Sequence, residues 1–119
     1  GIILFVNYFG PQKNSGTLSG ADFKLSAFSY DNSVYASLKV EKAAKKNMSE
    51  FENGIPVSVI FIARDKDGVP LQDEKLISRY EGNEIFIRTT FADYDIMSIG
   101  AVCSMNENYL NLECQIEKR

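Results

Sequence analysis

The sequence contains no histidine and no tryptophan, and it has only two cysteines among its 119 residues. Without histidine, the chain lacks the usual general base near neutral pH and has no Ser–His or Cys–His nucleophile pair. Two thiols without histidine cannot complete a structural zinc site. No glycine-rich phosphate loop precedes a helical pattern either. These absences predict a protein that is not an enzyme, has no catalytic residues, and uses neither a metal nor a cofactor.

Clustered positive charge is also scarce. The chain has 13 basic and 16 acidic side chains, for a net charge of −3, and its second half is the more acidic one. The only local basic cluster is Lys39, Lys42, Lys45 and Lys46, which contains Glu41 and is typical of a solvated face. Nucleic-acid binding is therefore not expected, because it needs a concentrated basic surface.

Long apolar runs are absent as well. The run Ile2 to Val6 is far shorter than the ~20 apolar residues that span a bilayer. It is interpreted either as a buried first strand, which is favoured, or as the end of a signal segment or membrane anchor. Because the chain begins with Gly1, we expect a segment upstream, and an anchor before residue 1 stays open.

What the sequence does contain is a regular alternation of apolar and polar residues. Hydrophobic residues make up 45% and charged residues 24%, the balance of one globular domain over residues 1–119. The alternation predicts an all-β fold, an antiparallel β-sandwich of about seven or eight strands, with a partly open β-barrel as the alternative. Residues 10–20 are predicted to be a loop. Helical spacing predicts one short helix over Glu41 to Glu52, closed by Asn53-Gly54.

A first hairpin is predicted over Phe23 to Tyr30 and Ser33 to Val40, with Asp31-Asn32 as its turn. This register places Phe28 opposite Tyr35, with Tyr30 diagonal to the pair. The three side chains are the candidate binding residues. They form either an exposed aromatic patch for a partner or a cross-strand pair covered by other parts of the chain, and the covered arrangement is favoured.

The second hairpin, from Met97 to Glu117, has the clearest pattern. A turn at Asn106-Glu107 predicts that Met97, Ile99, Ala101 and Cys103 face inward and pair with Ile116, Cys114, Leu112 and Leu110, respectively. Cys103 and Cys114 then lie about 13 Å apart along the strands, whereas a disulfide needs Cα atoms within about 7 Å. Both cysteines are predicted to be buried free thiols.

Between the hairpins, Val57 to Ala63 is apolar on both faces, which predicts a central strand covered on both sides. Further strands are expected over Val69 to Tyr80, Glu84 to Phe91 and Ile96 to Ser104, and Pro70 indicates an edge or a bulged start. Two acidic pairs, Asp65 with Asp67 and Asp93 with Asp95, are interpreted as turn residues. Neither has the further ligands of a calcium loop or a catalytic partner.

The run Val57-Ser58-Val59-Ile60-Phe61-Ile62-Ala63-Arg64-Asp65-Lys66-Asp67-Gly68-Val69-Pro70-Leu71 resembles the central hairpin of immunoglobulin-like and fibronectin-III-like modules of bacterial envelope proteins. The resemblance covers about 15 of the 119 residues. It implies a β-sandwich in the cell envelope, although the buried tryptophan of those modules is missing.

Two functions are compared. The first is a non-catalytic module that binds another protein, extracytoplasmic or periplasmic and associated with the cell envelope. The second is a small soluble inhibitor or immunity-type protein in the cytoplasm. Carbohydrate binding would need a groove lined by aromatic side chains such as Tyr30, Tyr35, Tyr80 and Tyr94.

Overall fold

The computed structural model describes residues 13–118, which form β-strands joined by short turns. The strands are β1 (Ser15–Leu18), β2 (Ala21–Tyr30), β3 (Ser33–Lys42), β4 (Ile55–Arg64), β5 (Pro70–Tyr80), β6 (Ile85–Ala92), β7 (Ser98–Met105), β8 (Asn108–Gln115) and β9 (Glu117–Lys118). The single helical element in this part of the chain is the 3-10 turn η1 (Met48–Phe51). The expectation for residues 2–6 lies outside the described residues.

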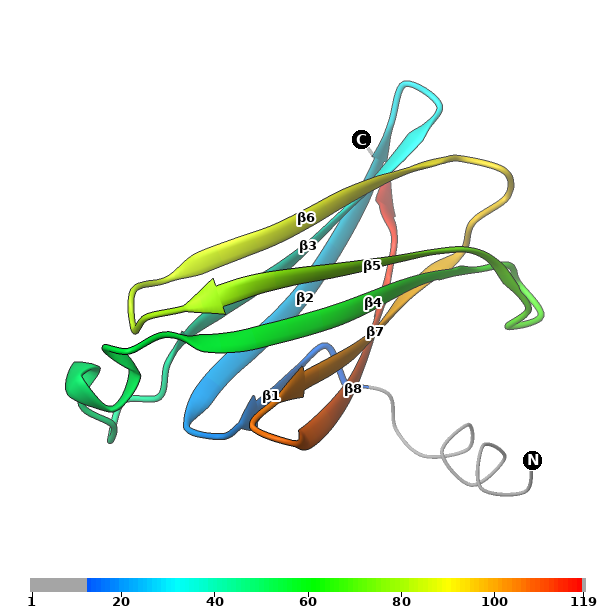
Figure 1. The fold of residues 1–119 in the computed structure, drawn as a ribbon. Helices are drawn as coiled ribbons and strands as arrows, with labels where there is room; N and C mark the ends of the chain where they lie inside the picture. The colour runs from blue at the N-terminus through cyan, green and yellow to red at the C-terminus, as the bar shows by residue number, and fades with distance from the viewer. Residues whose placement is uncertain (1–12, 119) are drawn as a thin grey trace, which may run out of the picture.

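The strands form two sheets packed face to face, which confirms the all-β sandwich (Figure 1). Sheet A has the order β1-β2-β3-β6, and β9 pairs with part of β2. Sheet B has the order β5-β4-β7-β8 and is an open row, not a closed barrel. In Figure 1, β4 and β5 pass in front of β2 and β3. The inner faces of both sheets contribute to one buried apolar cluster.

The first hairpin has the predicted register. Phe23 is paired with Val40, Ala27 with Ala36 and Phe28 with Tyr35. Asp31 and Asn32 have positive φ values of 50° and 64°, the left-handed conformation that a two-residue hairpin turn requires. The alternation and the turn specify the same register, because the buried residues of β2 lie opposite the buried residues of β3.

The second hairpin also follows the prediction, except at its open end. Cys103 is paired with Leu110 and Ile99 with Cys114, across a turn of Asn106 and Glu107 with positive φ at both residues. The predicted inward pairing of Met97 with Ile116 is wrong. Strand β7 begins at Ser98, and Met97 is 47% exposed. The Met97 N–H still donates to the Arg64 carbonyl, but the last residue of β7 that is paired with β4 is Ser98, one residue later than predicted.

Strand β4 differs from the expected strand that is covered on both sides. Val57, Val59, Phe61 and Ala63 are completely buried against sheet A. The alternate residues Ser58, Ile60, Ile62 and Arg64 are only half-buried. The prediction is wrong because the central strand of a sheet can have an unbroken apolar sequence in either case. Such a run does not show whether a second layer covers the outer face.

Two local predictions are corrected. The helix expected over Glu41 to Glu52 is not formed, because Glu41 and Lys42 extend β3 by pairing with Asp22 and Ala21. Only η1 is helical; the Asn47 N–H donates to Glu50 Oε2 at 2.9 Å at its start, and Gly54 follows it with φ 76°. The loop expected over residues 10–20 contains β1, whose residues pair antiparallel with the start of β2.

Strand β5 is an edge strand with a bulged start, as Pro70 indicated. Its register with β4 shifts between Ala63 and Arg64, and Arg64 is paired with Pro70. At its other end, Tyr80 is buried and meets the Phe51 ring edge-on with centroids 5.1 Å apart. The Tyr80 hydroxyl donates to the Gly82 carbonyl at 2.9 Å. This aromatic contact anchors η1 and closes one end of the core.

Candidate binding face of sheet A

The predicted binding residues lie on the outer face of sheet A. In β2 the odd-numbered residues Phe23, Leu25 and Ala27 are buried, so the even-numbered ones point away from sheet B. Phe28 and Tyr35 stack across the β2–β3 pair with ring centroids 5.1 Å apart and an interplanar angle of 23°. Stacking of this kind contributes about 0.5–1.5 kcal/mol beyond area burial. The predicted cross-strand aromatic pair is therefore present.

The exposure of these rings falls between the two predicted arrangements. Phe28 and Tyr35 are half-buried, and Tyr30 at the end of β2 is 59% exposed. Strand β9 lies beside this part of β2, with Glu117 as the parallel partner of Phe28. The rings are thus neither fully covered nor fully free, and one side of the stack faces away from the core.

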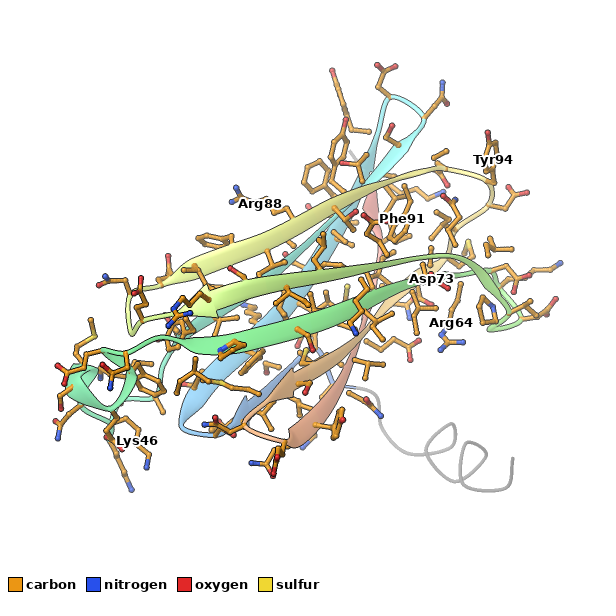
Figure 2. The ribbon with its side chains drawn as sticks, in the orientation of Figure 1. Lys46, Arg64, Asp73, Arg88, Phe91 and Tyr94 are labelled. Carbon is orange, nitrogen blue, oxygen red and sulfur yellow. The ribbon has the colours of Figure 1, made fainter. Side chains whose placement is uncertain are left out.

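Strand β6 adds two side chains that the sequence did not identify. Phe86 is 46% exposed, and the Arg88 guanidinium lies 4.7 Å from its ring centroid. This is a cation–π contact, and Figure 2 shows Arg88 projecting from β6. Within residues 13–118 no salt bridge of Arg88 is found. We call the outer side chains Phe28, Tyr30, Tyr35, Phe86 and Arg88 the aromatic face.

Phe86 and Arg88 were missed because β6 alternates without an obvious polar side. Its inward residues include Ile87 and Phe91, and its outward residues include Phe86. Only the pairing of β6 with β3, which puts Phe86 beside Lys39 and Arg88 beside Ser37, shows which set shares a face with Tyr35. The sequence did contain one indication of a shared face, because Phe86 and Arg88 are two residues apart and residues at that spacing lie on the same side of a strand.

Charged residues lie on the same face in the row of Phe86, which is paired with Lys39, and in the row beyond it. Lys24 is paired with Lys39, and Asp22 with Glu41. Like charges directly opposite each other are unfavourable, and the Lys39–Glu41 ion pair at 3.7 Å offsets part of this cost. The Thr17 hydroxyl donates to Asp22 at 2.7 Å. The side chains line a shallow depression of about 270 Å³ between β1, β2 and β3.

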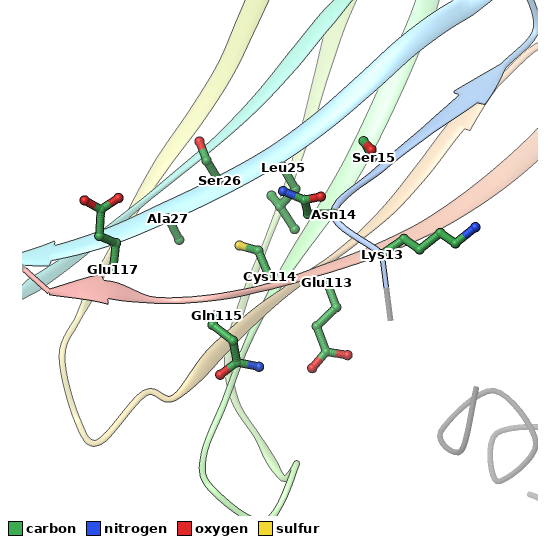
Figure 3. Close-up of a pocket in the computed structure, with 10 residues that line it drawn as sticks. All are labelled: Lys13, Asn14, Ser15, Leu25, Ser26, Ala27, Glu113, Cys114, Gln115 and Glu117. Carbon is green, nitrogen blue, oxygen red and sulfur yellow. The ribbon is translucent and has the colours of Figure 1, made fainter. Parts of the chain in front are cut away.

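A larger groove of about 560 Å³ opens at the side of the sandwich, between β2 and β8 (Figure 3). Leu25, Ala27 and Cys114 line it, and so does the segment before β1. The Lys13 carbonyl accepts from the Glu113 N–H of sheet B, and the Asn14 carbonyl accepts from the Leu25 N–H of sheet A. This short segment therefore ties the two sheets together at one end of the groove.

The two cysteines are free, as predicted, but they are not equally buried. Cys103 is buried in the core, whereas Cys114 is half-buried in the groove. Desolvation raises the pKa of Cys103 to about 12. Desolvation, with a contribution from the Glu113 charge, raises the pKa of Cys114 to about 11. Both thiols stay protonated at neutral pH, so neither has the thiolate character of a reactive cysteine.

The acidic turns have structural roles. Asp65 Oδ1 accepts the N–H groups of Asp67 and Val69, both at 2.9 Å, and Gly68 completes the turn with φ 79°. Asp93 Oδ1 accepts the Ile96 N–H at 3.3 Å. Tyr94 beside it is 73% exposed, whereas Tyr80 is buried in the core, so the four tyrosines named for carbohydrate binding do not share a groove.

Among residues 13–118, no group of three or more His, Cys, Asp or Glu side chains is placed to hold a metal ion. In the same part of the chain, no helix has the length and apolarity that a membrane span requires. Neither the models of known protein families nor the curated proteins give a match to this chain.

Proposed function

We propose that this chain is a non-catalytic interaction module that binds another protein through the aromatic face. The observation that carries the proposal is the half-exposed Phe28–Tyr35 stack, which shares one sheet face with Tyr30, Phe86 and Arg88. Aromatic residues and arginine are enriched at the centres of protein interfaces, because they bury a large area with few rotatable bonds. A flat sheet face that carries rings and a guanidinium suits a protein surface better than an enclosed small molecule.

An immunoglobulin-like arrangement is part of the proposal and is supported by the strand order. If β2 to β8 are read as strands A, B, C, C′, E, F and G, then the sheets are A-B-E and C′-C-F-G. Immunoglobulin-type sandwiches place A, B and E in one sheet and C, F and G in the other, with C′ beside C. Strand D has no counterpart here, and β1 and β9 are additions at the β2 edge.

The extracytoplasmic location in the proposal rests on the apolar run Ile2 to Val6, which is compatible with the end of an anchor. Fractionation of cells that express the full-length gene product tests it. Recovery of the protein in the envelope fraction is the result expected for an extracytoplasmic interaction module. Recovery in the cytosol would favour the inhibitor or immunity-type protein instead.

The binding proposal is tested by affinity capture from an extract of the native cells, with Phe86→Ser/Arg88→Ala as the principal variant. Both side chains are exposed, so we expect the melting temperature to change little while the captured partner is lost. Phe28→Ser/Tyr35→Ser should also lose the partner, and it should lower stability by the stacking contribution of about 0.5–1.5 kcal/mol in addition to the loss of the area that the two half-buried rings bury.

Ile77→Ser is the matched control, because Ile77 is 70% exposed on the other sheet. This variant should keep the partner. Retention of the partner by both aromatic-face variants would rule out the aromatic face as the binding surface.

A further inference from the structure

The outer face of sheet B carries a cluster of aliphatic side chains. Ile60 and Val102 are neighbours on β4 and β7, and Ile62 lies next to Ile60 on the same side of β4. All three are half-buried, and Ile77 on β5 is 70% exposed. We call these four residues the aliphatic face. Contiguous apolar patches on the surface of a soluble protein often mark an interaction site.

Charges of both signs border the aliphatic face on the β5 side. Lys75 is paired with Ile60, and Asp73 is paired with Ile62, so the two charges lie one row apart. Both are exposed, and neither forms a salt bridge within residues 13–118. Figure 2 shows Asp73 on β5 beside Arg64 on β4, at the same side of the molecule.

On the β8 side the same two rows end in Asn111 and Glu113. Asn111 is paired with Val102, and Glu113 is paired with Gly100, which lies opposite Ile62. A Cβ placed on Gly100 would lie 3.8 Å from Arg64 Nε, and Gly100 is buried, so the Arg64 side chain covers the face there. The two central rows are therefore Lys75-Ile60-Val102-Asn111 and Asp73-Ile62-Gly100-Glu113.

We propose that the aliphatic face binds a second copy of this chain, related by a twofold axis that crosses the strands between the two central rows. This axis exchanges the rows, so Lys75 of each copy faces Asp73 of the other. Ile60 then packs on Ile62, and Val102 faces the position of Gly100. A twofold interface requires a surface that is complementary to itself, and these two rows meet that requirement in charge.

Other twofold axes through the cluster are less favourable. An axis parallel to the strands places Asp73 of one copy over Glu113 of the other, since these residues end the same row. An axis across the strands through either central row places Lys75 over Lys75 or Asp73 over Asp73. Facing like charges cost several kcal/mol at an interface. The axis between the rows avoids all three conflicts.

The size of the face predicts a weak dimer. Four strands spaced about 4.8 Å apart, with about eight residues each, present roughly 500 Å² per copy. Two copies would bury about 1,000 Å², which is at the lower limit for specific interfaces. The dimer would leave both aromatic faces pointing outward, so two partner molecules could be bound at once.

Sedimentation equilibrium of residues 1–119 between ~10 µM and ~1 mM tests the association. We expect mostly monomer at the lower concentration and a substantial dimer fraction at the higher one, as for a weak interface. A monomer throughout this range would overturn the proposal.

A charge exchange then tests the axis. Lys75→Asp and Asp73→Lys should each weaken the dimer at least about tenfold, because each creates two facing like-charge contacts per dimer. The combined Lys75→Asp/Asp73→Lys variant should restore the wild-type dissociation constant to within about threefold, because opposite charges face each other again. All three proteins should keep the wild-type melting temperature, since both side chains are exposed and form no ion pair among the described residues.

Phe86→Ser, on the opposite sheet, is the matched control and should leave the dimer unchanged. Association that ignores the two single charge variants, or that the combined variant does not restore, would show that copies meet through another surface.

Discussion

The outer faces of the two sheets are both partly apolar, yet they are built from different side chains. The aromatic face of sheet A combines stacked rings with the Arg88 guanidinium. The aliphatic face of sheet B consists of isoleucine and valine, bordered by Lys75 and Asp73, for which the described part of the chain offers no salt bridge. Aromatic rings and guanidinium groups make contacts of specific geometry with many kinds of side chain on a partner. Aliphatic side chains contribute binding free energy mainly because their burial excludes water. This difference in side chains is the reason for proposing separate partners for the two surfaces.

The two faces also treat charge differently. On sheet A, Lys39 is paired with Glu41 at 3.7 Å. On sheet B, Lys75 and Asp73 share the side of one strand but form no ion pair with any residue between 13 and 118. A charge that is satisfied within the chain contributes little to recognition, while an unpaired one can still meet a partner.

The largest effect is expected on the inner side of β4. Phe61→Ala should lower the free energy of unfolding by about 3–5 kcal/mol, because it leaves a cavity in the core. Phe61 is 0% exposed, whereas its neighbour Ile60 is half-buried on the outer side. Ile60→Ala should therefore cost far less, about 1 kcal/mol. Urea denaturation measures both, and equal losses would mean that the outer side of sheet B is a core surface.

A smaller effect on the free energy of unfolding is expected at alkaline pH, where the thiols of Cys103 on β7 and Cys114 on β8 ionise. The folded pKa of Cys103 is about 12 and that of Cys114 about 11, both above the ordinary value of 9.0. The thiols ionise more easily in the unfolded chain, so their contribution to stability is complete below pH 9 and is lost as pH rises toward these values.

The slope should be about 1.4 kcal/mol per pH unit for each thiol. The Cys103→Ala/Cys114→Ala variant is the control, since it should have a flatter profile of unfolding free energy between pH 9 and 11. Identical profiles for the two proteins would show that the thiols are not desolvated.

The smallest effect is expected on the aromatic side, at the ion pair between Lys39 and Glu41. Glu41→Gln should change the free energy of unfolding by less than about 0.5 kcal/mol, because both side chains are partly exposed to water. Thermal denaturation at low and high salt measures it. If the free energy of unfolding fell by more than about 1 kcal/mol, Glu41 would be the main group that offsets the repulsion between Lys24 and Lys39.

The sequence predicted best where a strand and its neighbour are joined by a two-residue turn. Asp31-Asn32 and Asn106-Glu107 determine both hairpin registers, so the Phe28–Tyr35 pair and the four-residue offset of Cys103 and Cys114 followed from spacing. The helix over Glu41 to Glu52 failed because the pairing of Glu41 and Lys42 with β2 outweighs a weak helical preference. Cys114 was predicted to be buried, but it lies at the sheet edge beside an open groove.

The candidate site was only half predictable. Phe28, Tyr30 and Tyr35 share one hairpin, so a local register was sufficient to bring them together. Phe86 and Arg88 join them through β6, which follows β5 in the chain but pairs with β3 in the other sheet. No spacing rule connects residues that meet by a crossover between sheets.

What the sequence determined by itself is the strand content, the two hairpins and the absence of histidine chemistry, since each depends on neighbouring residues or on composition. The tertiary structure decided which strands share a sheet, and therefore which side chains share a face. It also decided that the outer side of β4 stays open, although its sequence is as apolar as that of a strand covered on both sides. The reason is physical: alternation specifies two sides of a strand, but only packing between distant segments determines which side is buried and what lies beside the other.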